Sequence, residues 1–472
     1  MKEKLLIGLL IIISFITILF FGYRKVNYHV DEVWTFGLAN HVGSIYPDIE
    51  YGKEYSGTGF YDDFMQVHSG EEFNYANVLN NQANDVHPPL YYFFIHTVCS
   101  IFKDSYSMWY GMAVNVFWMI PTIILLYHFI KELTGDILKT FGFVLVYITS
   151  MAVIDIYVFL RMYAQFVFFA IAIAYLIKKY WDRTLDKWFY ILFSLITILG
   201  LLSHYYFLIF AFFISAAYGV HLIIEKRFKE LRNCVITAVA DGALYLAMWP
   251  YIIDHIFKGG RGHQAIHSAF SIGGIVVGII LVAICVRIYK RGKEKYTYLT
   301  ALKLTGLFYG IVVLKIAPYL SPRYDSPVIF IAWFVIFNAV YRRLERSPKS
   351  SRAVQLTIGI LMFINIAIYT VWGFHVPNDY YSKSTVKLFE YMEGKKVIVY
   401  LRDDWEALCY FVPMQKAASY TFINDENMVL LDNAGKGDVI ITIGEYGDTI
   451  EQRIGVKPIH GKFSNYRCYE VL

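Results

Sequence analysis

The chain has 472 residues, of which 57% are apolar and 17% are charged. This composition excludes an ordinary soluble enzyme and indicates a protein of the lipid bilayer, where plentiful Tyr and Trp side chains suit the boundary between lipid and water. A net charge of +5 does not indicate a nucleic-acid partner, because the Lys and Arg residues stand in short clusters between apolar runs.

Apolar runs long enough to cross a membrane follow one another along most of the chain. A spanning helix needs about 20 residues, and about 17 are still sufficient. The first run follows two lysines and has no small-residue cleavage site after it, which predicts a retained signal anchor. In total the sequence predicts about eleven transmembrane helices, at residues 5–21, 108–130, 138–154, 157–177, 188–202, 205–224, 235–253, 270–288, 299–317, 328–339 and 354–372.

Positively charged junctions predict the orientation of these helices. Loops on the cytoplasmic side of a membrane carry an excess of Lys and Arg. Basic clusters occupy every second junction, so we expect these clusters and the N-terminus to be cytoplasmic. The clusters lie at residues 131–139, 178–187, 225–233, 287–295 and 341–352. The intervening junctions then face outward, and we expect a multi-pass protein of a bacterial cytoplasmic membrane.

The first outward segment, residues 23–106, is acidic and too long to be a simple connector. It ends in an apolar stretch near residues 88–103, which begins at a Pro pair suited to a first helical turn. Counting this stretch as a span would invert every later junction and place the basic clusters outside. We therefore expect an interfacial helix here.

The chain becomes polar after Trp372. The sequences KKVIVYL, ASYTFIN and GDVIITIG are typical of short strands, and stretches between them such as DDWEALCYF are typical of helices. The sequence therefore predicts a transmembrane module over residues 1–376, followed by a small extracytoplasmic α/β domain over residues 377–472.

Three acidic residues are candidates for chemistry because we expect them at the outer membrane boundary. Asp31 and Glu32 follow the first helix directly, where repulsion between adjacent carboxylates would raise one pKa and leave the other carboxylate poised as a base. On position alone, a solvated start to a polar loop is the simpler explanation. Asp155 is expected in a short turn between two spans, where it either serves the reaction or reaches the outer headgroups.

Basic residues near the same boundary are candidates for phosphate binding. Arg161 and Arg323, with Lys315 nearby, would make charge-assisted bonds to a lipid phosphate, although arginines at this depth also extend to headgroups without any function. His204 stands among aromatic residues, which is more typical of a structural histidine. His87 lies near the acids, but the spacing of the histidines matches no standard metal motif, so no metal site is predicted.

Taken together, these features resemble the GT-C superfamily of polyprenyl-phosphate-sugar glycosyltransferases, in particular the bacterial relatives of protein O-mannosyltransferase and aminoarabinose transferase. The resemblance covers about residues 1–330. It rests on an acidic pair after the first helix, a Pro-Pro-Leu motif led by His or Lys that closes the first loop, a second acid in the next outer loop, and an Arg-x-Tyr pair just after it. The matching residues are Asp31, Glu32, His87, Pro88, Pro89, Leu90, Asp155, Arg161 and Tyr163.

The resemblance implies an α-helical membrane enzyme of the GT-C fold that uses a polyprenyl-phosphate-linked sugar and needs no metal or other cofactor. We expect Asp31 to act as general base on an acceptor hydroxyl, with Glu32 or Asp155 orienting the acceptor and with inversion at the sugar carbon. The acceptor would be a wall polymer, a glycolipid or a protein of the cell envelope. The residues expected to bind the substrates are His87, Arg161, Tyr163, His204, Lys315, Arg323 and Tyr324.

A transporter or flippase for a lipid-linked or polar substrate is the alternative function. Asp155, Arg161 and Lys315 would then line a polar path across the membrane. Against this alternative, the polar residues gather at the outer ends of the predicted spans, and the sequence shows no pair of helices broken at the middle of the bilayer.

Overall fold

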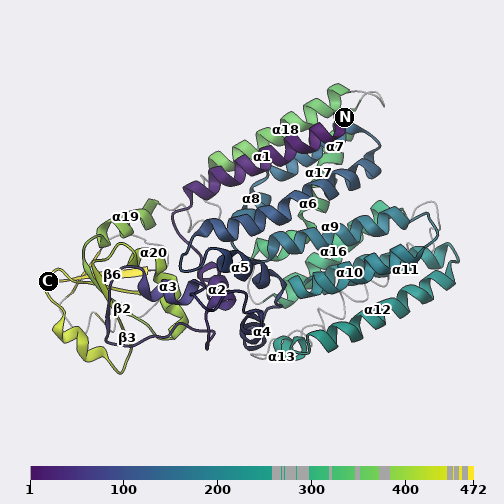
Figure 1. Cartoon of the computed structure of the whole chain (residues 1–472). Helices are drawn as coiled ribbons and strands as arrows, with labels where there is room; N and C mark the ends of the chain where they lie inside the picture. Colours follow the sequence, from purple (N-terminus) through teal and green to yellow (C-terminus); the bar gives the residue numbers. More distant parts are fainter. Residues whose placement is uncertain are drawn as a thin grey trace.

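The computed structural model describes residues 2–257, 297–317, 321–345, 351–371, 383–443, 456–459 and 466–472, together with His267, Ser271, Ala283 and Ile450. Long helices lie side by side in one bundle, and a small sheet domain lies at one end of it (Figure 1). The N-terminus lies at the opposite end of the bundle from the sheet domain (Figure 1).

Within the described residues, eight helices are long and apolar enough to cross a membrane, with a bent pair as a further span. The eight are α1 (Lys2–Arg24), α6 (Met108–Thr134), α9 (Tyr163–Tyr180), α11 (Phe207–Ile224), α12 (Phe228–Met248), α16 (Tyr298–Ile316), η2 (Pro322–Val328) with α17 (Ile329–Leu344), and α18 (Ser351–Val371). Two shorter helices, α10 (Lys187–Ser203) and α13 (Ile252–Phe257), complete this part of the bundle. Every predicted span except 270–288 overlaps a described helix, and that run lies outside the described residues apart from Ser271 and Ala283.

Polar residues at the junctions determine where several of these helices begin. Ser107, Asp136, Asp186 and Thr297 each accept a hydrogen bond from a backbone N–H in the first turn of the helix that follows. Such caps pair N–H groups that have no partner inside a helix. The helix α6 ends at Gly135, whose φ of 65° is the left-handed conformation common at helix C-termini.

The third predicted span is a bent pair of helices. The helix α7 (Ile137–Ile148) and the helix α8 (Met151–Val158) meet at 59°. The irregular link to the next helix spans residues 159–162, so the predicted runs 138–154 and 157–177 divide the chain in the wrong place. Periodicity could not show this, because the apolar residues continue through the bend and the link.

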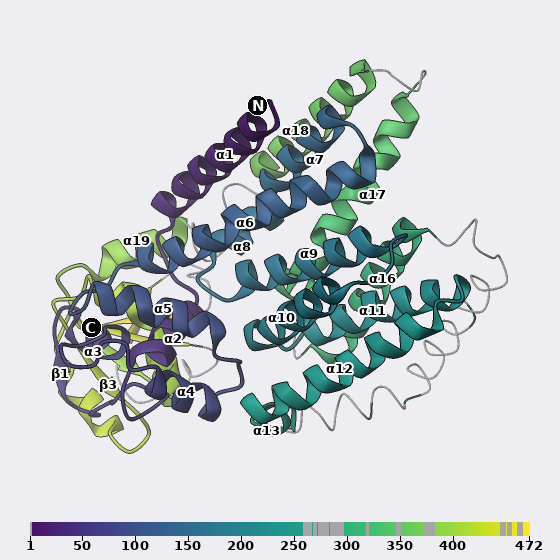
Figure 2. The ribbon, with the colours of Figure 1, turned by 45° about the vertical axis from the view of Figure 1, so that its right-hand side comes forward.

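The first loop, residues 23–106, folds into short elements between the bundle and the sheet domain (Figures 1 and 2). They are α2 (Val30–Asn40), β1 (Glu54–Tyr55), α3 (Gly59–Met65), α4 (Tyr75–Asn84) and α5 (Leu90–Ile101). The helix α5 follows the Pro pair as predicted, and its 12 residues are too few to cross a bilayer. It packs against α2, α6 and α10, and its place at the membrane interface stays a prediction.

The sheet domain has six strands in the order β1-β3-β2-β4-β6-β5. The three predicted strand sequences form β2 (Lys396–Tyr400), β3 (Ser419–Ile423) and β4 (Val439–Ile443), which pair in parallel at its centre. The strands β5 (Val456–Pro458) and β6 (Tyr466–Val471) extend one side. On the other side, β1 pairs antiparallel with β3, so the sheet draws on the first loop as well as on residues 377–472.

Aromatic packing fixes this domain against the first loop. Phe411 begins the helix α20 (Phe411–Met414), and its ring centroid lies 5.4, 5.3 and 5.5 Å from those of Tyr28, Tyr61 and Tyr106. The Tyr61 hydroxyl also donates to the carbonyl of Ala407 at 3.0 Å. The apolar core is therefore continuous from the helix bundle into the sheet domain. The candidate site lies beside this junction.

Candidate active site

The acidic pair stands in the first turn of α2. His29 is the N-cap: its Nδ1 accepts from the Asp31 N–H at 3.1 Å, and its own N–H donates to Glu32 Oε2 at 2.9 Å. This reciprocal capping box pairs N–H groups that the helix leaves free, and carboxylates are favourable at a helix N-terminus. The box turns the two acids apart, because the Asp31 side chain is 23% exposed whereas that of Glu32 is fully buried.

Glu32 joins α2 to the link between α8 and α9. Its carboxylate pairs with the buried ammonium of Lys25 and accepts the Leu160 N–H at 2.8 Å. Lys25 also donates to the carbonyl of Val158 at 3.2 Å. These bonds give Glu32 a structural position, with both oxygens engaged inside the protein. Lys25 was missed by sequence reasoning, since a lysine just after a span is an ordinary feature.

Arg161 lies in the irregular link at 159–162, and not inside the end of a helix as the sequence suggested. Its Nη1 donates to the backbone carbonyl of Asp31 at 3.1 Å and to Thr35 Oγ1 at 3.3 Å, and its Nη2 lies 3.1 Å from His87 Nε2. The side chain is buried, and its Nε–H has no partner among the described residues. A buried N–H of a permanent cation is suited to an oxygen of an anionic ligand.

His87 is held from its other side by Asp85, a residue that sequence reasoning missed. His87 Nδ1 lies 2.5 Å from Asp85 Oδ2. Burial raises the pKa of Asp85, but His87 and the backbone N–H of Val86 outweigh burial and hold the pKa at about 2. Both ring nitrogens of His87 are therefore engaged by protein groups. The spacing Asp-x-His before the Pro pair was the available signal.

Cations surround the Asp31 carboxylate. Burial raises its pKa, but the positive charges of Arg161 and Arg323, together with the interaction with His29, outweigh burial and leave the pKa of Asp31 below its usual value. The sequence argument expected mutual repulsion to raise the pKa of one of the two acids and to leave the other poised as a base; Asp31 is not an acid whose pKa is raised. Lys25 balances the charge of Glu32 inside the protein. The arginines keep the carboxyl group of Asp31 ionised.

Asp155 and Arg323 reach the same region from different elements. Asp155 is not in a turn between spans, as expected, but on the last turn of α8. One of its carboxylate oxygens is buried without a partner among the described residues, and the charges of Arg323, Glu32 and Lys25 act on it. The Arg323 guanidinium stands 3.8 Å above the ring of Phe159.

The remaining candidates form an aromatic wall next to these charges. The ring of Tyr163 lies 5.6 Å from that of His204, which stacks on Phe166 at 4.7 Å. Burial, with further effects of His87 and of the Arg161 charge, lowers the pKa of His204 to about 3, so this ring is neutral. Tyr324 joins the wall through Tyr206, with ring centroids 5.3 Å apart.

Lys315 is not joined to this cluster by a hydrogen bond or an ion pair within the described residues. Its side chain is exposed in the last turn of α16, and no contact with the other candidates is found in the described part of the chain. The structure thus brings together Asp31, Asp155, His87, Arg161, Tyr163, His204, Arg323 and Tyr324, with Glu32 buried beneath them. Within the described residues, no group of three or more His, Cys, Asp or Glu side chains is arranged to hold a metal ion.

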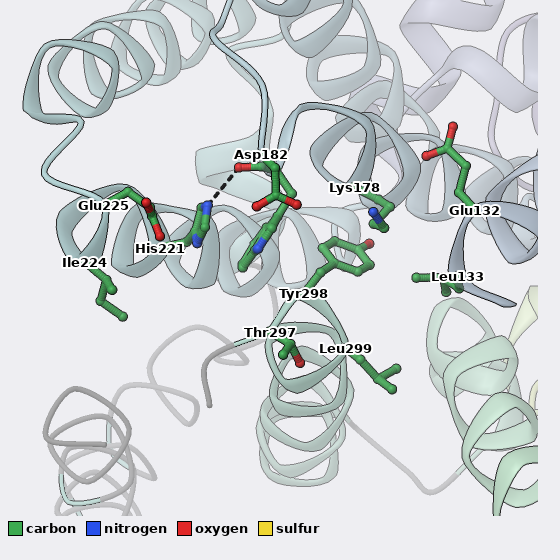
Figure 3. Close-up of a pocket in the computed structure, with 11 residues that line it drawn as sticks. Glu132, Leu133, Lys178, Asp182, His221, Ile224, Glu225, Thr297, Tyr298 and Leu299 are labelled. Atoms are coloured by element: carbon green, nitrogen blue, oxygen red, sulfur yellow. Dashed lines mark hydrogen bonds between the residues drawn. The ribbon is translucent and has the colours of Figure 1, made fainter. Parts of the chain in front are cut away.

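A separate cavity of about 340 Å³ opens at the other ends of the helices. Figure 3 shows Glu132, Lys178, His221 and Tyr298 gathered around it. His221 Nε2 lies 2.7 Å from the carbonyl of Trp181. Its lining residues lie within or next to four of the basic clusters, and none belongs to the candidate site. This cavity is therefore distinct from the acid and arginine cluster.

No family model matches the sequence, and no curated protein matches it. The structure of ArnT from Cupriavidus metallidurans bound to undecaprenyl phosphate is similar with a TM-score of 0.51, at 8% identity, over 98% of this chain and 97% of ArnT. The apo state of ArnT gives a TM-score of 0.42 at 9% identity, over 93% and 95%. The archaeal oligosaccharyltransferase AglB from Archaeoglobus fulgidus, in complex with an inhibitory peptide and a dolichol-phosphate, gives 0.47 at 10% identity, over 100% and 74%.

The fold therefore defines the class of protein. The chain is a polytopic α-helical membrane protein of the GT-C fold with a small sheet domain near its C-terminus, which confirms the fold predicted from the sequence. The likeness to the lipid-bound ArnT structure extends along nearly the whole length of both chains. At 8% identity, this similarity establishes the fold alone.

Proposed function

We propose that the chain is a membrane glycosyltransferase that moves a sugar from a polyprenyl-phosphate donor to an acceptor hydroxyl on the outer side of the membrane. The observation that carries this proposal is that Asp31 and Arg161 lie next to each other. An ionised, partly exposed carboxylate stands beside a buried guanidinium that keeps one N–H without a partner among the described residues. The shared fold supports the proposal, because the ArnT structure holds undecaprenyl phosphate.

In this reaction Asp31 takes the proton of the acceptor hydroxyl as its oxygen attacks the anomeric carbon of the donor. The new carbon–oxygen bond forms while the bond between that carbon and the phosphate oxygen breaks, and the lipid phosphate leaves with the bonding electrons. A single displacement of this kind inverts the configuration at the anomeric carbon. Proton acceptance by a positioned carboxylate contributes about 10²–10⁴-fold to such a step.

Arg161 and Arg323 would bind the phosphate. A phosphate monoester leaves as an anion, and guanidinium groups stabilise it by charge-assisted hydrogen bonds that are strong in a water-poor site. Neither a general acid nor a metal is then required, so activity in the presence of a strong chelator is part of the proposal. The acceptor would bind on the exposed side of Asp31, near Asp155 and the aromatic wall.

Transfer of labelled sugar from polyprenyl-phosphate donors tests the proposal in membranes that carry equal amounts of each variant. We expect Asp31→Asn to lower transfer at least 100-fold, since the amide keeps the shape of the side chain but cannot accept the proton. Asp48→Asn is the matched control, because Asp48 is a 77% exposed acid of the same loop. Equal transfer by wild type and Asp31→Asn would remove Asp31 from the mechanism.

A transporter or flippase of a lipid-linked substrate is the second candidate. The bend between α7 and α8, with the buried carboxylate of Asp155 beyond it, is the observation that favours it. A transporter needs no general base at Asp31. Lipid translocation by reconstituted protein that survives Asp31→Asn, together with no sugar transfer across a broad panel of donors and acceptors, would favour this function.

A further inference from the structure

Asp85 has no role in the proposed reaction, yet its carboxylate is buried at the site. The residue is the C-cap of α4, and its side chain is only 12% exposed. A carboxylate at a helix C-terminus is unfavourable, because the helix dipole places partial negative charge there. An acid at position 85 therefore does not stabilise α4. The 2.5 Å contact between Asp85 and His87 gives this acid a role instead.

The contacts of His87 determine which nitrogen carries its proton. Arginine is always charged and can only donate hydrogen bonds, so His87 Nε2, 3.1 Å from Arg161 Nη2, must accept. Nδ1 then carries the hydrogen of the neutral ring and donates it to the Asp85 carboxylate. A second group bonded to one ring nitrogen commonly selects the tautomer of a functional histidine in this way.

The Arg161 guanidinium is anchored at both terminal nitrogens. Nη1 donates to the carbonyl of Asp31 and to Thr35 Oγ1, and Nη2 donates to His87. Because the guanidinium is planar, these anchors also determine the orientation of Nε–H, which is buried and unpaired among the described residues.

We propose that Asp85 is a positioning residue: it fixes the Nδ1–H tautomer of His87, and His87 in turn holds the Arg161 guanidinium so that its Nε–H is available to a phosphate oxygen of the donor. The part that concerns the donor rests on the proposed function. The part that concerns the tautomer rests on the contacts alone. His87 thereby acts through Arg161, and this differs from the direct substrate contact expected from the sequence.

Nitrogen NMR of the full-length protein with ¹⁵N-labelled histidine tests the tautomer without any donor. Loss of a signal in His87→Gln identifies the resonances of His87. We expect the Nδ1–H tautomer alone in the wild type and a mixture of both tautomers in Asp85→Asn, because the Asn amide can accept from Nδ1–H or donate to Nδ1 and so no longer excludes the Nε2–H form. An Nε2–H tautomer in the wild type, or the same tautomer in both proteins, would overturn the proposal whether or not the chain transfers sugar.

Transfer kinetics test the consequence for Arg161. Asp85→Asn should lower transfer about 10–100-fold, by analogy with the loss of a group that orients a metal-bound histidine. His87→Gln offers Arg161 an amide oxygen near the place of Nε2 and has no tautomer to fix. In that background Asp85→Asn should change transfer less than about 2-fold. Equal losses of transfer in both backgrounds would show that Asp85 only supports folding. Absence of transfer in the wild type would count against the proposed function and would leave the NMR result unaffected.

Discussion

Asp31 and Glu32 are neighbours in the chain, yet their side chains lie in opposite environments. The capping box directs Glu32 inward to Lys25 and leaves Asp31 facing the arginines. One acid therefore holds two segments together, and the other remains available for chemistry. A buried ion pair of this kind is costly to break from one side, since the remaining charge stays buried without a partner.

Asp85 makes the stability of the protein depend on pH. Its pKa is about 2 in the folded protein, below the value of 3.8 for an ordinary Asp. The contribution of the Asp85 carboxylate to the free energy of unfolding is therefore complete well above pH 4 and is lost as the pH falls toward 2. A lowering of the pKa by this amount corresponds to about 2 kcal/mol. We expect Asp85→Asn to unfold more easily than the wild type at pH 7, and this difference to shrink by roughly half at pH 3.

Unfolding of the detergent-solubilised protein at both pH values measures this effect. Asp48→Asn serves as the control for general acid effects, because Asp48 is largely exposed. If the free energies of unfolding of wild type and Asp85→Asn differ by the same amount at pH 7 and at pH 3, the lowered pKa of Asp85 is contradicted.

At the scale of elements, α2 carries the site and is positioned by close packing. It contacts α3, α4 and α5 on the side of the first loop, and Arg161 and Glu32 bind it to the link before α9. The approach of α3 is so close that a Cβ built on Gly37 would lie 2.0 Å from the ring of Phe64. Residue 37 must therefore remain Gly for α2 and α3 to pack in this way.

Gly37→Ala should destabilise the first loop by about 1–3 kcal/mol, the usual cost of an overpacked contact. Because α2 carries Asp31, sugar transfer should fall together with the unfolding temperature. Gly242→Ala in α12 is the matched control, since a Cβ there meets nothing within 4 Å. Unchanged stability and transfer in Gly37→Ala would mean that α2 and α3 are farther apart than described.

At the scale of the whole molecule, the first loop and the sheet domain form one structure beside the site. The strand β1 extends the sheet, and Phe411 packs on three tyrosines of the first loop. One of these, Tyr28, directly precedes the N-cap of α2. Loosening the domain should therefore disturb the residues that carry the chemistry.

Phe411→Ala should lower the free energy of unfolding by about 3–5 kcal/mol, as expected for a buried aromatic residue, and should also lower sugar transfer. Val429→Ala is the control in the same domain, because Val429 is 59% exposed. Thermal unfolding and transfer assays on matched preparations measure both effects. Full transfer in a destabilised Phe411→Ala would separate the sheet domain from the site.

Much of the architecture was predictable from local patterns. Apolar runs and basic junctions predict the spans, because the bilayer requires long apolar helices, and the Pro pair predicts where α5 begins. Three strand sequences predict the centre of the sheet, because strands buried on both faces are nearly continuous apolar runs. The acid pair, the His-Pro-Pro motif and Arg161 were identified in the same way.

The sequence alone thus determined the membrane class, the spans, the central strands and most of the residues that meet at the site. Tertiary structure decided the bend at α7–α8, the pairing of β1 with β3, and the roles of Lys25, Glu32 and Asp85. The physical reason is that a pattern along the chain records burial and charge for each residue, while a role such as that of Asp85 arises from contacts between segments far apart, as between Asp85–His87 and Arg161.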